Sequence, residues 1–255
     1  MNVLPLSPGY PSEMNDHVRA LAAAGASVIG VGDRPREELA QSTQDALVKY
    51  VRIDGCDNVG DAVLEWVHRA SARIDRVEAM WEPLVLPAAA LREALGVSGM
   101  GVEVARRFRD KEIMKATLRE AGLRVPRSSR ESTRAGVVSA VAAVGLPVII
   151  KPIDGAGSAD TYRVDREDQL LAVLDRLGHV AEVSVEELVD GDEYTYDTLC
   201  VDGVAVYENI AQYLPRPLLA RTDERCAPII ITIRDLSDPV RQRSAVSTQL
   251  AEERG

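Results

Sequence analysis

Residues 145–158 read GLPVIIKPIDGAGS, and this stretch decides how the rest of the sequence is interpreted. The apolar, β-branched run from Leu146 to Lys151 predicts a buried strand that carries one lysine at its end. The loop 154–160 follows, and its glycines let backbone N–H groups approach an anion without a Cβ clash. A lysine at a strand end beside such a loop fits a phosphate clamp, although short glycine patterns are often ordinary turns.

Two flanking segments strengthen the phosphate interpretation. The first, FRDKEIM at 108–114, places Lys111 at the start of a helix expected over 110–121, with Asp110 able to cap its free N–H groups. The second, VEELVDGDEYTYD at 185–197, carries the carboxylates of Glu186 and Glu193 on strands expected over 183–187 and 193–201. Acidic residues on strands are usually solvated, so these carboxylates gain meaning only from the combination.

Together the strand, the loop and the two flanking segments resemble the ATP-grasp superfamily, in the same order and over residues 102–234. Within it the sequence looks most like the carboxylate-amine ligases, including ligases similar to carnosine synthase. The resemblance implies an ATP-grasp α+β fold over 102–255. A lid-type subdomain would occupy about 112–182, and the start of a second subdomain about 183–255.

The resemblance also implies an ATP site. Two lysines would bind the triphosphate, the second of them at its α and β phosphates, beneath a mobile glycine loop. One glutamate would face the adenine amino group, two neighbouring backbone positions would read the base, and an acid further on would hold the ribose hydroxyls. In that order these residues are Lys111 and Lys151, Gly155, Ala156, Gly157 and Ser158, then Glu186, Glu187 and Val189, and Glu193. Lys115, one helical turn beyond the first lysine, is expected to be a solvated surface charge.

Residues 1–96 predict a separate domain. Apolar strands and amphipathic helices alternate there, among them a short strand expected over 50–53, as in a small doubly wound parallel sheet, so the fold class is α/β. Asp33 ends the second expected strand, where a dinucleotide-binding fold has its ribose acid. The first turn, 7–11, lacks the three-glycine fingerprint, which argues against nicotinamide binding. The domain resembles the one that usually precedes an ATP-grasp domain.

The family holds Mg²⁺ with acidic and amide side chains of later strands, and the sequence ends before such a pattern. After a strand expected over 228–233, residues 235–255 predict one polar helix. We therefore expect a C-terminally truncated ATP-grasp domain whose metal ligands lie beyond residue 255. No catalytic residue is assigned, and this chain alone is expected to be weak or inactive.

Composition narrows the partners. A formal charge of -10 argues against nucleic acid, because binding to phosphates of a polymer needs a surplus of basic residues. No apolar run approaches the roughly 20 residues that span a bilayer, and no signal peptide is visible, so the expected compartment is the cytoplasm. Cys56, Cys200 and Cys226 are too scattered for a disulfide framework or a zinc site. Oligomeric state, including a homo-oligomer, is left open.

The implied reaction uses ATP and Mg²⁺ to join a small carboxylate to a small amine through an acyl phosphate. Phosphoryl transfer depends on positioning and electrostatics, so loss of the metal ligands would remove most of the rate and leave some nucleotide affinity. Two alternatives remain at this point. One is a non-catalytic nucleotide-binding or regulatory module, and the other is an ATP-grasp kinase or acyl-CoA ligase.

Overall fold

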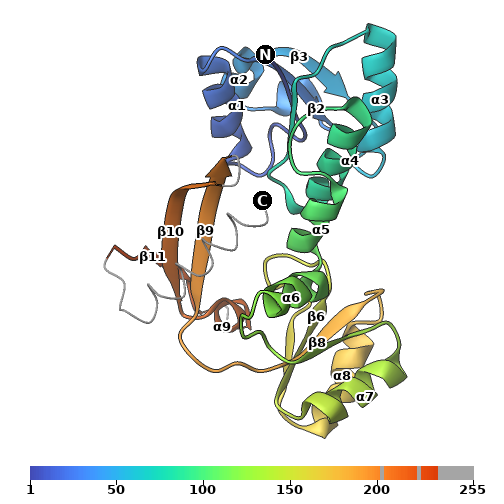
Figure 1. Cartoon of the computed structure of the whole chain (residues 1–255), viewed down its shortest axis with the longest axis vertical. Helices are drawn as coiled ribbons and strands as arrows, with labels where there is room; N and C mark the ends of the chain where they lie inside the picture. Colours follow the sequence, from blue (N-terminus) through green and yellow to red (C-terminus); the bar gives the residue numbers. More distant parts are fainter. Residues whose placement is uncertain (202–203, 223–224, 235–255) are drawn as a thin grey trace. The chain divides into compact units, whose positions relative to one another are not determined.

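The computed structural model describes residues 1–201, 204–222 and 225–234, which form two compact units, Met1–Met114 and Lys115–Gly255 (Figure 1). Asp202-Gly203, a dipeptide that predicts a two-residue hairpin turn, lies outside the described residues, as does the predicted tail helix over 235–255. Of the described helices, none is both long and apolar enough to cross a membrane.

The first unit is built on a four-stranded sheet in the order β3-β2-β1-β4, and its pairings are parallel. Its strands are β1 (Asn2–Pro5), β2 (Ser27–Gly32), β3 (Leu47–Arg52) and β4 (Arg76–Glu78). Its helices are α1 (Met14–Ala23), α2 (Gln41–Ala46), α3 (Val59–Ala70), α4 (Val85–Leu95) and α5 (Val102–Arg109), with 3-10 turns η1 (Arg36–Glu38) and η2 (Glu82–Leu84). α6 (Lys111–Glu120) crosses the division between the units.

Helices cover both faces of this parallel sheet. Val28 of β2 packs in one apolar cluster with Met14 and Val18 of α1, whereas Ile29 belongs to a second cluster with α3 and α4. Neighbouring residues of a strand point to opposite faces, so the two clusters lie on opposite sides of the sheet. The continuous apolar run of β2 is typical of a parallel strand buried on both faces. The predicted doubly wound α/β domain is confirmed.

The second unit contains a four-stranded antiparallel sheet in the order β5-β8-β6-β7, called here the lid sheet. Its strands are β5 (Ser128–Glu131), β6 (Val148–Pro152), β7 (Tyr162–Val164) and β8 (Val183–Glu187), and its helices are α7 (Arg134–Val144) and α8 (Glu167–Arg176). Val141 of α7, Leu174 of α8 and Val185 of β8 share one apolar cluster, so α7 and α8 pack on the same face.

The alternation along β8 gives the lid sheet two unlike faces. Val183 and Val185 point into the apolar cluster with α7 and α8. Ser184 and Glu186 must then point to the opposite face, because side chains alternate along a strand. Lys115 of α6 hydrogen-bonds to both of these polar side chains. One face of the lid sheet is therefore an apolar core, and the other carries buried polar and charged groups.

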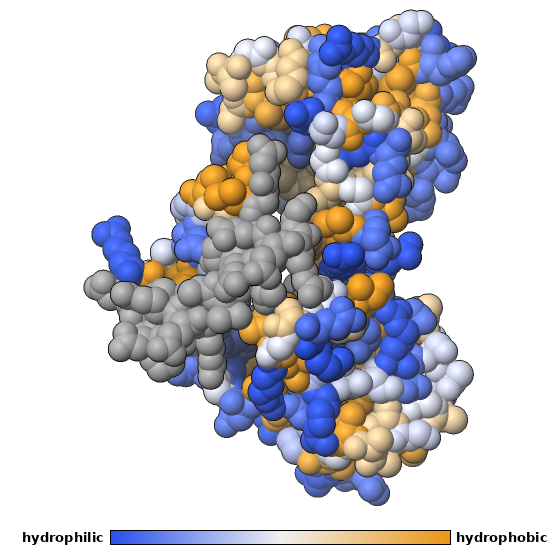
Figure 2. Space-filling view, viewed as in Figure 1, coloured by the Kyte–Doolittle hydropathy of each residue, from blue (hydrophilic) through white to orange (hydrophobic). Residues whose placement is uncertain are grey.

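A three-stranded antiparallel sheet follows, in the order β11-β10-β9. It contains β9 (Tyr194–Val201), β10 (Val204–Leu214) and β11 (Ile229–Thr232), and α9 (Pro217–Thr222) lies between the last two strands in sequence. Many of its large apolar side chains are exposed, among them Leu199, Val204, Tyr207 and Ile229. Figure 2 shows hydrophobic residues reaching the surface in several places on the face drawn.

Candidate nucleotide-binding site

Lys151 and Glu186 lie on neighbouring antiparallel strands of the lid sheet. The register places Ile149 opposite Glu186 and Lys151 opposite Ser184. The apolar residues before Lys151 form β6 because they fill the core against α7 and α8, which fixes the lysine close to the strand end. Strand pairing thus brings together Lys151 and Glu186, which are 35 positions apart in the sequence motif.

The Glu186 carboxylate is bound by two ammonium groups. Lys115 Nζ lies 2.9 Å from Glu186 Oε2 and 2.9 Å from Ser184 Oγ, and Lys151 Nζ forms an ion pair with Glu186 Oε1. The Lys115 side chain is 8% exposed, that of Glu186 is 9% exposed, and that of Lys151 is 25% exposed. Lys151 is therefore the cation of this group that solvent or a ligand reaches most easily.

The prediction that Lys115 is a solvated surface charge is wrong. Lys115 lies about one helical turn beyond Lys111 on α6 and is buried against the polar face of the lid sheet. A signal for this contact exists in the sequence of β8. Ser184 and Glu186 alternate with buried valines, and a polar side chain that a strand turns inward needs a partner.

The charges of this group favour an anion. Two ammonium groups meet one carboxylate here, and Lys151 is the more exposed of the two cations. A phosphate oxygen at about 4 Å from a lysine gains about 4 kcal/mol of raw Coulomb attraction at an effective dielectric of 20. The arrangement can therefore hold an anionic group near Lys151.

The glycine loop directly follows β6. Gly157 and Ser158 both have left-handed backbone conformations, with φ of +60° and +55°. Glycine adopts this region freely, whereas it is uncommon for serine. The Ala159 N–H donates to the Ala156 carbonyl at 3.2 Å, which closes a tight turn within the loop. Ala156 and Gly157 are exposed, so this turn presents backbone to solvent next to the strand that carries Lys151.

Residues 187–189, at the end of β8 and just after it, are called here the hinge. Glu187 does not bind the lysines that bind Glu186. Its carboxylate pairs with Arg127 at 2.7 Å and Arg124 at 2.5 Å. The hydrogen bond from Arg127 is the main cause that holds the pKa of Glu187 below its usual range. The Glu187 N–H donates to the Arg127 carbonyl at 2.9 Å, so this backbone donor is already occupied within the lid sheet.

The remaining predicted site residues lie outside the lid sheet. Val189 follows β8 and is half exposed, and Glu193 is exposed directly before β9. Asp110 Oδ1 accepts the N–H groups of Glu112 and Ile113 at 3.0 Å each, so the predicted helix cap is confirmed. Lys111 begins α6 in the first unit. Its convergence with Lys151 on one cleft stays a prediction.

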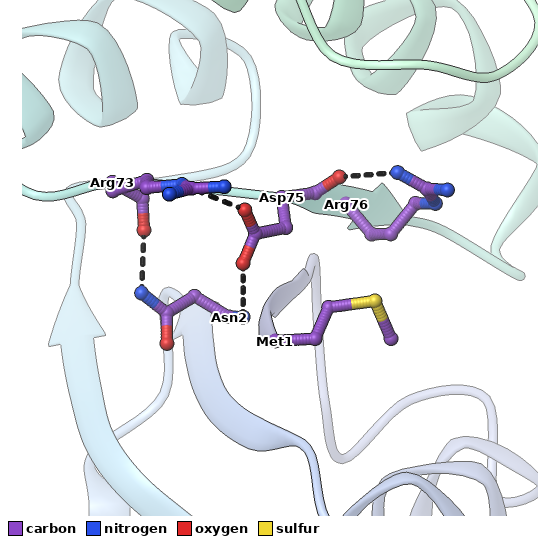
Figure 3. A pocket seen from close by; sticks show the side chains of 5 residues that line it. All are labelled: Met1, Asn2, Arg73, Asp75 and Arg76. Carbon is purple, nitrogen blue, oxygen red and sulfur yellow. Dashed lines mark hydrogen bonds and ion pairs between the residues drawn. The ribbon is translucent and has the colours of Figure 1, made fainter.

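One further hollow lies in the first unit, where β1 and β4 begin (Figure 3). The Asn2 N–H donates to Asp75 Oδ2 and the Asn2 side-chain amide to the Arg73 carbonyl, both at 2.7 Å. Arg76 donates to the Asp75 carbonyl at 2.8 Å. These groups bond to one another, and they lie at the amino ends of parallel strands, whereas ligands of such sheets bind beyond the carboxyl ends. The hollow is therefore a structural junction.

Three known proteins show what the chain is similar to, although no family model matches it. An L-arginine-specific L-amino acid ligase of Bacillus subtilis is 27% identical over 146 residues, which are 54% of this chain and 35% of that ligase. The solved L-amino acid ligase of Bacillus licheniformis has a TM-score of 0.72 at 17% identity, over 98% of this chain and 60% of that one. The biotin carboxylase domain of 2-oxoglutarate carboxylase from Hydrogenobacter thermophilus, solved with MgADP, has a TM-score of 0.71 at 15% identity, over 99% of this chain and 58% of that one.

These likenesses confirm the resemblance to the ATP-grasp enzymes. The fold is the ATP-grasp fold preceded by a doubly wound domain, and the sequence likeness is to amino acid ligases, the carboxylate-amine type that the motifs indicated. The chain spans about a third of the length of the curated ligase and 60% of the length of the solved one.

Proposed function

We propose that this chain supplies the ATP-binding part of an ATP-dependent carboxylate-amine ligase. The single observation that carries the proposal is the charge group on the polar face of the lid sheet. Lys151, Glu186 and Lys115 meet there, and the strand that carries Lys151 leads directly into a loop in which Gly157 and Ser158 have left-handed backbone conformations. The likeness to amino acid ligases and to a carboxylase domain solved with MgADP supports the same choice of ligand.

In this proposal each residue group has a role toward ATP. Lys151 binds the α and β phosphates, and Lys111 binds the triphosphate as a second cation. Gly155, Ala156, Gly157 and Ser158 close over the phosphates through backbone N–H groups. Glu186 faces the adenine amino group, the Glu187 and Val189 backbones read the base, and Glu193 holds the ribose hydroxyls.

The reaction we propose has two steps. A carboxylate oxygen of the acid substrate attacks the γ-phosphorus of ATP, the bond to the β-γ bridging oxygen breaks, and ADP leaves. The amine substrate then attacks the carbonyl carbon of the acyl phosphate, inorganic phosphate leaves, and the amine nitrogen loses a proton to form the amide. Small carboxylates and amines are the partners of the complete ligase, and neither step needs nucleic acid or a membrane.

Magnesium would neutralise charge on the γ-phosphate as it is transferred. Among the residues that the structure describes, no group of three His, Cys, Asp or Glu side chains could hold a metal ion. The chain's own contribution is to bind and orient ATP.

The test is nucleotide binding by calorimetry. We expect Lys151→Ala to weaken ATP binding at least tenfold, about 1.4 kcal/mol, because a phosphate loses its cationic partner. Lys49→Ala is the matched control, since it removes the same charge from an exposed residue that lies over the Trp66 ring in the first unit. Equal affinities of the two variants, or no ATP binding by the unmodified chain, would contradict the proposal.

Product analysis with the complete ligase separates the reaction classes. A ligase yields ADP, phosphate and an amide, whereas a kinase yields ADP and a stable phosphorylated product, and an acyl-CoA ligase yields a thioester. A regulatory module binds the nucleotide and yields none of these products.

A further inference from the structure

We propose that Lys115 is a positioning residue that releases Lys151 for phosphate binding by holding the charge of Glu186 on its own. The inference rests on the proposed ATP site and assigns a role in it to a buried lysine that the family motif does not explain. It follows from the way in which the ammonium groups of Lys115 and Lys151 bind different oxygens of the Glu186 carboxylate.

The two lysines bind different oxygens of Glu186. Lys115 Nζ contacts Oε2, and Lys151 Nζ contacts Oε1. Movement of Lys151 onto a phosphate would therefore leave Oε2 bound to Lys115. Without Lys115, the same movement would leave the Glu186 carboxylate, which is 9% exposed, with neither of its two lysine partners. A buried charge without a partner is costly, so Lys151 would stay on Glu186.

Ser184 fixes Lys115 in this role. Its hydroxyl is fully buried on the polar face of β8 and accepts from Lys115 Nζ at 2.9 Å. The ammonium group is thus tied to two neighbouring side chains of one strand, while Lys151 comes from the next strand and is more exposed. Lys115 is therefore held in place by two buried side chains, whereas Lys151 has, among the described residues, only one side-chain partner to leave when it moves onto a phosphate.

The residue type supports this division. Lys49, Lys111, Lys115 and Lys151 are the four lysines among thirty basic residues, and the others are arginine. The planar fork of arginine tends to bind both oxygens of a carboxylate, whereas a lysine ammonium is a point charge that can bind one. A lysine at 115 leaves the second oxygen available to Lys151.

The decisive experiment is a titration with tripolyphosphate, a probe that lacks adenine and so avoids the contact assigned to Glu186. We expect Lys115→Met to weaken tripolyphosphate binding about tenfold, because Lys151 becomes the counter-ion of Glu186. The double variant K115M/E186Q should recover most of that loss, since a neutral amide no longer holds Lys151. A purely structural Lys115 predicts no recovery, and a double variant as weak as K115M would overturn the proposal.

A second readout uses the small number of lysines. Reductive methylation with ¹³C-formaldehyde labels the four lysines and the amino terminus, and the dimethyl signals are assigned by single Lys→Arg substitutions. Tripolyphosphate should shift the Lys151 signal in the unmodified chain but not in K115M, while the Lys49 signal stays constant. A Lys151 shift of equal size in K115M would also overturn the proposal.

Two controls keep the outcomes distinct. If K115M does not fold by circular dichroism, Lys115→Gln replaces it, because glutamine keeps a donor near Ser184 and removes the charge; the same recovery by E186Q is expected. If the unmodified chain binds neither ATP nor tripolyphosphate, the proposed function fails. If it binds both and the Lys115 variants bind equally well, the inference fails and the function stands.

Discussion

The parallel sheet of the first unit and the lid sheet of the second unit differ in the kind of side chain that their faces bury. Both faces of the parallel sheet are covered by apolar helices, and Thr43 is the buried polar residue among the described residues of that unit. The lid sheet has one apolar face, and its other face buries Lys115, Ser184 and Glu186.

This difference separates scaffold from chemistry. Burial of apolar surface stabilises a fold, whereas burial of charge costs free energy unless each charge is paired. A buried ion pair is therefore weak support for stability and a better indicator of a functional site. The first unit is expected to lose stability when apolar volume is removed, and the lid sheet is expected to lose stability when a charge is left without its partner.

The largest effect is expected for Glu186→Ala. It leaves Lys115 buried without the carboxylate, so we expect a loss of about 3–5 kcal/mol in the stability of the lid sheet. Hydrogen exchange of β6 and β8 amides measures it. Glu182→Ala is the control, because Glu182 forms an exposed pair with Arg130 and should cost less than about 1 kcal/mol. Similar losses for both variants would remove the distinction between the two sheets.

Leu4→Ala tests the apolar side of the comparison. Leu4 of β1 is fully buried, and its truncation should cost about 2–5 kcal/mol through lost burial and a cavity. Both tryptophans, Trp66 and Trp81, lie in the first unit, so urea unfolding followed by tryptophan fluorescence reports on it. Val48→Ala, at a residue that is 66% exposed, should change the midpoint little. A change in the exchange of lid-sheet amides in Leu4→Ala would contradict separate stabilities.

The fold was predictable because apolar periodicity is a local property. The strand over 183–187 has the predicted bounds, and the helix predicted over 110–121 and the strand predicted over 228–233 each differ from α6 and β11 by one residue at either end. β5 was missed, since Ser128–Glu131 has no apolar residue and pairs through its backbone at a sheet edge, where polar residues are normal. β3 begins at Leu47 rather than at residue 50, because the parallel pairing with β2 extends back to that residue.

The site was predictable only in part. The motif identified Lys151 and Glu186, and strand pairing brings them together. Lys115 could not be placed, because helical spacing says which residues share a face and does not say which face meets the sheet. Long-range pairing decides that question. The contact between Lys115 and Glu186 spans 71 positions of the sequence.

Tyr50 sharpens the comparison from the scaffold side. Burial is the main cause that raises its pKa to about 12, and Asp33 adds to the shift. An ionisable group in the first unit is thus kept neutral, whereas those of the lid sheet are paired as ions. Since the folded pKa lies above the unfolded value of about 10, the stabilising contribution is complete below pH 10 and is lost as pH rises toward 12. Tyrosine ionisation is followed by absorbance at 295 nm in an alkaline titration. The component that titrates at the highest pH should be lost in Tyr50→Phe, and Asp33→Asn should move it to lower pH. An unchanged profile in Tyr50→Phe would contradict the assignment.

The smallest effect is expected for Arg127→Ala at the hinge. The Arg127 and Arg124 side chains are largely exposed, so losing one partner of Glu187 should cost less than about 1 kcal/mol. The pKa of Glu187 is lowered chiefly by the Arg127 hydrogen bond, so this stabilisation is present above the ordinary carboxyl pKa and is lost as pH falls through the lowered value. Acid unfolding should therefore begin at a higher pH in Arg127→Ala, while stability at pH 7 changes little.

Arg166→Ala is the control for ATP binding, because it removes a similarly exposed partner, from Asp168 on α8, away from the hinge. If both variants weakened ATP binding equally, the hinge would have no special relation to the nucleotide. A loss confined to Arg127→Ala would indicate that the ion pair between the Arg127 side chain and the Glu187 carboxylate keeps this end of β8 in place for the base.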